Sequence, residues 1–145
     1  MRKILLILLV AAALSTTRAV ADNIAITAQQ LPKAAQEWLS THYPNCKVVT
    51  ALHDRDITDN DYSVRLDNGT KVEFDSNGKW ESVKGNSAKL PSGVVPAVIE
   101  SYVLQHYPQS PIVKIERKRY GYEVELANDL DLKFDTKGRF IGLDD

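Results

Sequence analysis

The sequence predicts an α+β protein made of two tandem α-β4 units, with helices packed on one face of an antiparallel sheet and a cleavable signal peptide in front. Three observations lead to this prediction. The first 21 residues have the layout of an export leader, and a pattern recurs at an offset of 60 to 64 residues. Each copy of the pattern joins one helical stripe to alternating strand segments, which suits a two-layer fold.

Residues 1–21 form the predicted signal peptide. Two basic residues precede an unbroken apolar run over 4–14, and an A-x-A cleavage signal occupies 19–21, which is the usual order of a secretory leader. Cleavage there removes three of the 18 basic residues and none of the 19 acidic ones. We therefore expect a mature chain of 124 residues that begins at Asp22 and carries a formal charge of −4.

The predicted mature chain excludes several classes of protein. Its acidic balance disfavours a nucleic-acid binder, and without a second long apolar run it contains no membrane span. Asp22 stands where a lipoprotein needs a cysteine, and Cys46 is the only cysteine, so no intramolecular disulfide can form. We expect a soluble periplasmic or secreted protein that depends on its hydrophobic core.

An internal repeat divides the mature chain. Segments 31–53 and 95–117 align at an offset of 64, and segments 61–83 and 121–143 align at an offset of 60. Twelve of the 46 aligned pairs are identical, where unrelated sequences would share about three. The shared motifs are His-Tyr-Pro, Tyr-x-Val-x-Leu and Phe-Asp-x-x-Gly. The alignment predicts a tandem repeat.

One helix opens each predicted unit. Apolar residues recur at helical spacing over 31–43 and again over 95–107. Pro32 suits the first helical turn and Pro44 ends the pattern, and the second segment repeats both prolines. Each helix is apolar on one side only, so it needs a partner to cover that side.

Four short strands follow each predicted helix. Alternating apolar and polar residues mark them, and Asp67-Asn68-Gly69 is the strongest hairpin signal. In the first unit the strands are expected at about 47–53, 62–66, 71–74 and 79–83, and the second unit repeats them from 112–118 onward. Such alternation predicts a sheet with one face covered by helix and the other exposed to solvent.

The predicted units span 22–84 and 85–145, joined by a connector at 84–89 rich in glycine, asparagine and serine. A unit of about 50 residues buries too little surface to be reliably stable alone. We therefore expect the two units to form one compact domain, either by sharing a sheet or by packing side by side.

Signatures of metal and cofactor binding are weak. The candidate metal ligands are three histidines, His42, His53 and His106. The two helix-terminal histidines suit the helix dipole, and none has a partner at zinc spacing. The turns at Asp75 and Asp135 resemble calcium loops only loosely, because Lys84 falls where an EF-hand loop needs glutamate. We expect no metal and no cofactor.

Catalytic motifs are absent from the sequence. It contains no G-x-S-x-G elbow, P-loop, H-E-x-x-H motif or paired-glycine dinucleotide fingerprint. Its acidic residues fall at turns and on the polar side of alternating strands, where solvated carboxylates are normal. The sequence therefore predicts a protein that is not an enzyme.

The uncovered face of the sheet is the candidate binding surface. Parity places six charged residues there: Arg65, Lys71, Glu73, Glu123, Glu125 and Lys133. Mixed charge is ordinary on a solvated sheet face, but it also suits recognition of a partner. Trp80, Tyr120 and Phe140 are candidate anchors if they are exposed. Trp80 and Phe140 occupy equivalent repeat positions and would equally well fill the core.

The repeated pattern resembles the PepSY-like, β-lactamase-inhibitor-protein-like exported domains of Bacteroides-type bacteria. The resemblance rests on three features of each repeat. Leu31-Pro32 or Val95-Pro96 opens a helix, Tyr-Pro ends it, and the strand motifs Tyr-x-Val-x-Leu and Phe-Asp-x-x-Gly follow. The resemblance covers about 31–143. It implies helices on one face of an antiparallel sheet and a non-enzymatic envelope protein. The inhibitor relatives present a concave sheet to an enzyme, but they carry disulfides that this chain cannot form.

The leading functional hypothesis is a binding module for a protein or peptide of the cell envelope, with inhibition of an envelope hydrolase as a specific case. The open sheet face would carry this recognition. The alternative is a binder of a small ligand or metal at the junction of the repeats, through His42, His53 or His106.

Overall fold

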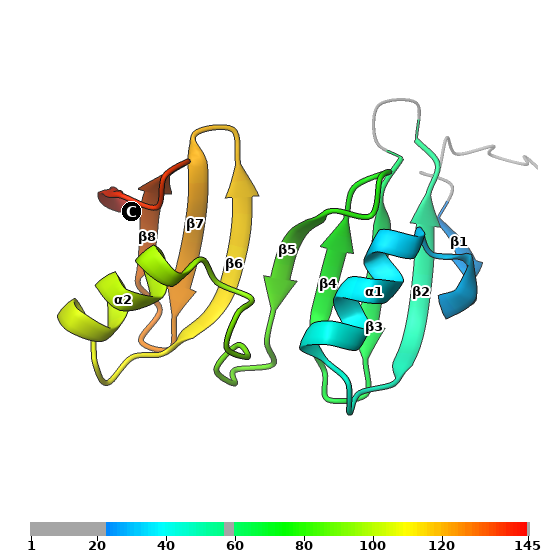
Figure 1. Ribbon diagram of the computed structural model, residues 1–145, viewed down its shortest axis with the longest axis horizontal. Helices are drawn as coiled ribbons and strands as arrows, with labels where there is room; N and C mark the ends of the chain where they lie inside the picture. The colour runs from blue at the N-terminus through cyan, green and yellow to red at the C-terminus, as the bar shows by residue number, and fades with distance from the viewer. Residues whose placement is uncertain (1–22, 57–59, 145) are drawn as a thin grey trace, which may run out of the picture.

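The computed structural model describes residues 23–56 and 60–144, which form one large antiparallel sheet with two helices in front of it (Figure 1). The strands are β1 Asn23–Ile26, β2 Val48–Asp54, β3 Tyr62–Leu66, β4 Lys71–Phe74, β5 Trp80–Lys84, β6 Ile112–Lys118, β7 Gly121–Leu126, β8 Asp131–Asp135 and β9 Phe140–Asp144. The helices are α1 Lys33–His42 and α2 Ala97–His106, and a short 3₁₀ helix, Ala28–Gln30, precedes α1. The strand order in the sheet follows the chain order.

The predicted fold class, two tandem α-β4 units, is wrong. β5 and β6 pair with each other from Ser82↔Glu116 to Lys84↔Lys114, and the described strands form one open nine-stranded sheet. The two helices are short, with ten residues each. Two separate sheets would each leave a further edge of unpaired N–H and C=O groups, and the pairing of β5 with β6 removes those edges.

β1 is a strand that the sequence analysis did not predict. It pairs antiparallel with β2, from Asn23↔Asp54 to Ile26↔Ala51. β1 thereby covers the outer backbone edge of β2, which would otherwise be free to pair with another chain. Its four residues are largely exposed and carry no clear alternation. The predicted signal peptide over 1–21 lies outside the described residues.

The core lies between the helices and the sheet. α1 crosses in front of β2 to β4, and α2 crosses in front of the strands of the second half (Figure 1). Trp38 of α1 meets Phe74 of β4 edge-on with ring centroids 5.6 Å apart, and Tyr102 of α2 meets Phe134 of β8 in the same way at 5.4 Å. Burial of these aromatic and aliphatic surfaces is the main favourable contribution to the stability of the fold.

The two Phe-Asp-x-x-Gly turns pack directly against the starts of the helices. Gly78 and Gly138 have φ angles of +83° and +78°. A Cβ on Gly78 would lie 2.9 Å from the backbone nitrogen of Ala35, and a Cβ on Gly138 would lie 3.2 Å from the Cβ of Val98. Glycine is required at both turns because the backbone is left-handed and the helix is close.

The connector between the halves is attached to β6. The Gly85 N–H donates to the Val113 carbonyl at 2.8 Å, and the Leu90 N–H donates to the Ile112 carbonyl at 3.0 Å. Leu90 is buried in the core. The division of the chain into 22–84 and 85–145 stays a prediction.

Candidate functional site

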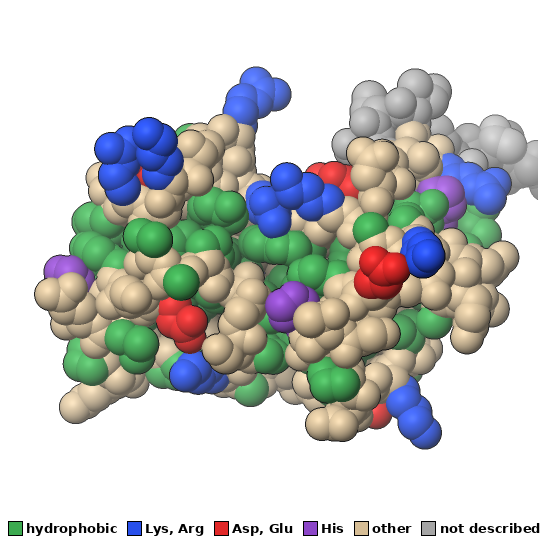
Figure 2. Space-filling view, in the orientation of Figure 1, with side chains coloured by type: hydrophobic (Ala, Val, Ile, Leu, Met, Phe, Trp, Pro, Cys, Tyr) green, Lys and Arg blue, Asp and Glu red, His purple; other side chains and the backbone are tan. Residues whose placement is uncertain are grey.

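The sheet has one face that carries the helices and one open face, and the charged residues predicted as a site lie on the open face. Figure 2 shows the helix-bearing face, where apolar side chains cover broad areas and charges are scattered. In the strands the buried residues Val64, Val72, Val124 and Leu132 belong to the core. The alternating positions point the other way, and they hold Arg65, Lys71, Glu73, Glu123, Glu125 and Lys133.

Strand register arranges the open face in rows that run across the strands. We call one of them the charged row, and its members from β3 to β9 are Arg65, Lys71, Lys84, Lys114, Glu125, Asp131 and Asp144. A second row, two residues along each strand, contains Glu73, Ser82, Glu116, Glu123 and Lys133. Neighbouring strands are about 4.8 Å apart, so consecutive members of a row are direct neighbours.

The first four members of the charged row are all cations. Arg65 pairs with Lys71, Lys71 with Lys84, and Lys84 with Lys114, so four positive charges lie on four adjacent strands. Like charges directly opposite each other destabilise a sheet. This repulsion is reduced by two ion pairs. Nζ of Lys71 lies 3.2 Å from Oε1 of Glu73, and Lys114 pairs with Glu116. Within the described residues no ion pair is formed by Arg65 or Lys84.

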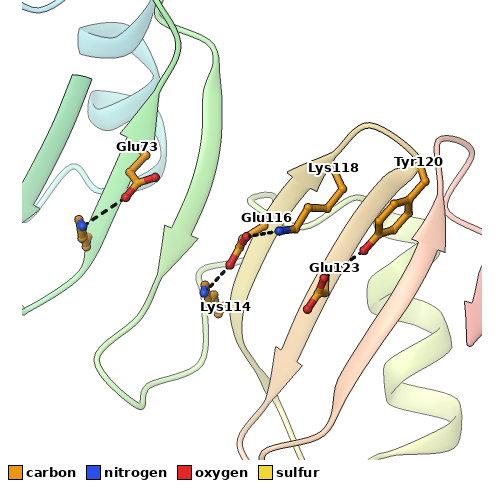
Figure 3. A network of polar contacts seen from close by, with 7 residues as sticks. Glu73, Lys114, Glu116, Lys118, Tyr120 and Glu123 are labelled. Atoms are coloured by element: carbon orange, nitrogen blue, oxygen red, sulfur yellow. Dashed lines mark hydrogen bonds and ion pairs between the residues drawn. The ribbon is translucent and has the colours of Figure 1, made fainter. Parts of the chain in front are cut away.

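Glu116 connects two lysines on the open face, as Figure 3 shows. It contacts Lys114 on one side and the Nζ of Lys118 at 2.9 Å on the other. Partial burial alone would raise the pKa of Glu116, but the hydrogen bonds from the two lysines outweigh burial and hold the pKa below its ordinary value. The hydrogen bonds to Glu116 raise the pKa of Lys114 and of Lys118. All three groups are therefore charged at neutral pH.

Tyr120 is the candidate anchor that lies beside this network (Figure 3). Its hydroxyl donates to Oε2 of Glu123 at 3.0 Å, and the Nζ of Lys133 lies 5.8 Å from the centre of its ring. Desolvation, followed by the hydrogen bond to Glu123, raises the pKa of Tyr120 to about 12. The side chain is 39% exposed, so it keeps an accessible aromatic surface next to the charges.

The other two candidate anchors lie on the helix-bearing side. Trp80 pairs with Phe74, which points into the core, and is only 7% exposed. The guanidinium of Arg117 lies 4.0 Å from the centre of its ring. Phe140 stacks on Tyr102 of α2 with ring centroids 4.8 Å apart. The structure therefore separates Trp80 and Phe140 from the charged residues of the open face.

A groove of about 600 Å³ crosses the open face at β3 to β6. The predicted residues that line it are Arg65, Lys71, Glu73 and Glu125, and Lys84 and Lys114 complete the cationic part of the lining. The loop at Gly85-Asn86-Ser87 also lines the groove. Glu123 and Lys133 lie outside this groove, farther along the same face.

Sequence reasoning noted the basic run from Lys114 to Arg119 but missed Lys84, Asp131 and Asp144 as members of the surface. Strand alternation after Val83 would have assigned Lys84 to the open face. Its position beside Lys114 depends on the pairing of β5 with β6, however, and the sequence left open whether the two units share a sheet. The continuity of the charged row could not be seen without it.

The histidines do not gather into a metal site. His106 stacks on Tyr102 of its own helix with ring centroids 4.0 Å apart, and His42 lies against Trp38 in a tilted arrangement with ring centroids 4.7 Å apart. His53 stacks on Tyr62, and its Nε2 lies 2.7 Å from Oδ1 of Asn60. Partial burial lowers the pKa of His42. No group of three or more His, Cys, Asp or Glu side chains in 23–56 and 60–144 could hold a metal ion.

The turns at Asp75 and Asp135 use their carboxylates internally. Oδ1 of Asp75 accepts the backbone N–H groups of Asn77 and Lys79, each at 2.9 Å. Oδ1 of Asp135 accepts the two equivalent N–H groups, and its Oδ2 accepts Nε of Arg139 at 2.7 Å. These hydrogen bonds account for the conserved spacing inside each turn without a bound cation.

The fold is that of a small domain with a wide antiparallel sheet, two helices on one side and a polar open face. The chain belongs to the PepSY-like, beta-lactamase-inhibitor-like family, whose pattern matches residues 18–67 and 60–142. The family resemblance predicted from the sequence is thus confirmed.

Solved structures from Bacteroides are similar to this chain over most of its length. One is a provisionally named calcium-regulated periplasmic protein of Bacteroides thetaiotaomicron, with 39% identity and a TM-score of 0.82, covering 86% of this chain and 98% of the other. A periplasmic protein of the DUF2874 family from Bacteroides vulgatus has 39% identity and a TM-score of 0.81, with 87% and 99% coverage. The comparison with curated proteins found no match.

These relatives support a periplasmic location. Both similar structures are described as periplasmic proteins. In the described part of the chain, neither helix has the length and apolar character needed to cross a membrane. The coarse part of the predicted location, the periplasm, is therefore supported by the relatives.

Proposed function

We propose that the protein is a non-enzymatic binding module, periplasmic or secreted, that recognises a protein or peptide of the cell envelope through its open sheet face. Inhibition of an envelope hydrolase is a specific case of this role. The observation that carries the proposal is the groove over β3 to β6, which four predicted site residues line together with Lys84 and Lys114.

The two faces differ in what they offer a partner. α1 and α2 occupy much of one face, and their buried side chains are part of the core. The open face presents side chains from β3 to β9 without such a cover, and Tyr120 adds a partly exposed ring. A broad charged surface can bind a partner of complementary charge, and an exposed aromatic ring is a common contact in protein interfaces.

Family membership supports the same class of function. The family is described as beta-lactamase-inhibitor-like, and an inhibitor acts by binding a protein surface. Calcium regulation is part of the name of the Bacteroides thetaiotaomicron relative. For this chain we propose a surface for a protein partner, because the charged side chains that line the groove are four cations and two carboxylates.

Capture of envelope proteins on the immobilised protein tests the proposal. The wild type should retain a partner that the quadruple variant Arg65→Glu, Glu73→Lys, Glu123→Lys and Glu125→Lys loses. A matched control reverses Lys33 and Lys137, two exposed lysines outside the open face. Circular dichroism and thermal melting establish that all variants are folded. A partner that binds the quadruple variant as well as the wild type would show that the open face is not the binding surface.

A further inference from the structure

The charged row changes sign once along its length. From β3 to β6 its members are the cations Arg65, Lys71, Lys84 and Lys114, and from β7 to β9 they are the anions Glu125, Asp131 and Asp144. A sheet face that serves only solubility has both signs interspersed. Within this row each sign forms a continuous block. The resulting like-charge repulsion is reduced by Glu73, Glu116 and Lys133 of the neighbouring row, which pair with Lys71, Lys114 and Asp144.

A ligand with charges of one sign would not match both blocks. A phosphate chain or a sulfated glycan would be attracted to β3–β6 and repelled at β7–β9. The groove itself contains Glu73 and Glu125 beside the cations, which also disfavours a purely anionic ligand. A polypeptide is the ligand class that carries acidic and basic groups at separate positions along one extended molecule.

We propose that the charged row binds an extended segment of the partner protein in which an acidic block adjoins a basic block. The segment lies across the strands, with its acidic block over β3–β6 and its basic block over β7–β9. This inference rests on the proposed function and specifies the chemistry of the partner.

The length of the row sets the length of the segment. The six intervals between β3 and β9, at about 4.8 Å each, give a row about 29 Å long. An extended peptide advances about 3.3 Å per residue, so about nine residues span the row. The acidic block occupies the groove over β3–β6. The basic block begins at Glu125 of β7, which also lines the groove, and continues to Asp131 and Asp144.

Arg65 and Lys84 are the best test positions in the cationic block. Lys71 and Lys114 already contact Glu73 and Glu116, whereas no ion pair is recorded for Arg65 or Lys84 among the described residues. Neutralising these two residues therefore removes contacts to a ligand without leaving a carboxylate of the protein unpaired. It also relieves repulsion in the row, so the variants should be at least as stable as the wild type.

Fluorescence anisotropy with synthetic nine-residue peptides tests the inference. The probe peptide has four glutamates, a glycine and four lysines, and its matched control has the same composition with alternating charges. We expect the block peptide to bind about tenfold more tightly than the alternating one at low salt, and to weaken at high salt. Arg65→Gln with Lys84→Gln should weaken the block peptide about tenfold, and Asp131→Asn about threefold. Lys33→Gln with Lys137→Gln is the matched control and should leave binding unchanged.

Three outcomes would overturn the inference. Equal binding of the block and alternating peptides would show that the charged row does not distinguish the order of charges along a peptide. Tighter binding of an all-glutamate peptide or of a sulfated glycan would assign the row to a ligand of one sign. Concentration-dependent dimerisation in sedimentation experiments, abolished by Lys84→Gln, would make a second copy of the chain the occupant.

The failure of this inference can be told apart from the failure of the proposed function. In one outcome, charge reversal of the open face abolishes capture of an envelope protein while Arg65→Gln, Lys84→Gln and Asp131→Asn leave capture unchanged. In that case the proposed function stands, and the charged row is not the part of the open face that binds the partner. If capture is indifferent to every open-face change, the proposed function itself is wrong.

Discussion

β5 and β9 occupy equivalent places in the two halves of the chain, yet one is an interior strand and the other is an edge. Val83 of β5 is fully buried, while Leu143, 60 positions later, is 51% exposed; Trp80 is 7% exposed and Phe140 37%. β6 covers β5, and Arg117 and Tyr122 pack against Trp80. β9 has no following strand in the described sheet. Burial here depends on the neighbouring strand more than on the local pattern.

The largest expected effect comes from truncating the equivalent aromatics. Trp80→Ala should lower the free energy of unfolding by about 3 to 5 kcal/mol, because a large buried ring leaves a cavity. Phe140→Ala should cost about 1.5 kcal/mol, since much of its ring is already in contact with water. Urea denaturation of both variants measures the difference. Equal losses would mean that the strand next to β5 adds nothing to the burial of Trp80.

The glycine turns provide the next comparison. Gly78→Ala should cost about 3 kcal/mol, because the added Cβ would strain a left-handed backbone and press on the backbone of α1. Gly138→Ala should cost about 1.5 kcal/mol, because its Cβ would meet a side chain of α2 that can move. Thermal or urea unfolding ranks the two variants. The reverse order would show that α2 is held more rigidly against its turn than α1.

Lys84 and Asp144 are equivalent positions with opposite surroundings. Lys84 lies between Lys71 and Lys114 in the charged row, so Lys84→Gln should stabilise the protein by about 0.5 kcal/mol. Asp144 forms an ion pair with Lys133 at 3.2 Å, so Asp144→Asn should destabilise it by about 0.3 kcal/mol. Urea titrations at low salt measure both changes, and a stabilising Asp144→Asn would contradict the assigned pairing.

The smallest effect concerns the acid response of the Asp135 turn. The backbone hydrogen bond from Arg139, with its side-chain hydrogen bond, holds the pKa of Asp135 below its ordinary value. A lowered folded-state pKa means that this contribution to stability is complete above the unfolded pKa of about 4 and is lost as the pH falls through the folded pKa. Arg139→Gln should move the pKa of Asp135 part of the way back, as NMR titration of the carboxyl group would show. An unchanged pKa would assign the shift to the backbone alone.

The sequence predicted the features that depend on local pattern. Helix spacing and the flanking prolines located α1 and α2, and the glycine turns and alternation located β3 and β4. β1 was missed, and the pairing of β5 with β6 was left open, because both pairings bring together segments separated by a helix and no local signal encodes such pairing. For the same reason alternation placed Arg65 and Glu125 on one face, but it could not show that Lys84 and Lys114 join them into a row.

The sheet also has a consequence for how the chain reaches its native state. Each strand is bonded to the one before it in the chain, so the pairings connect segments that are near in sequence. The two widest closures are β1 with β2, which spans the 3₁₀ helix and α1, and β5 with β6, which spans α2. Low sequence separation between contacts favours rapid folding. The sheet can therefore grow strand by strand along the chain, and β9 is the final strand in that order.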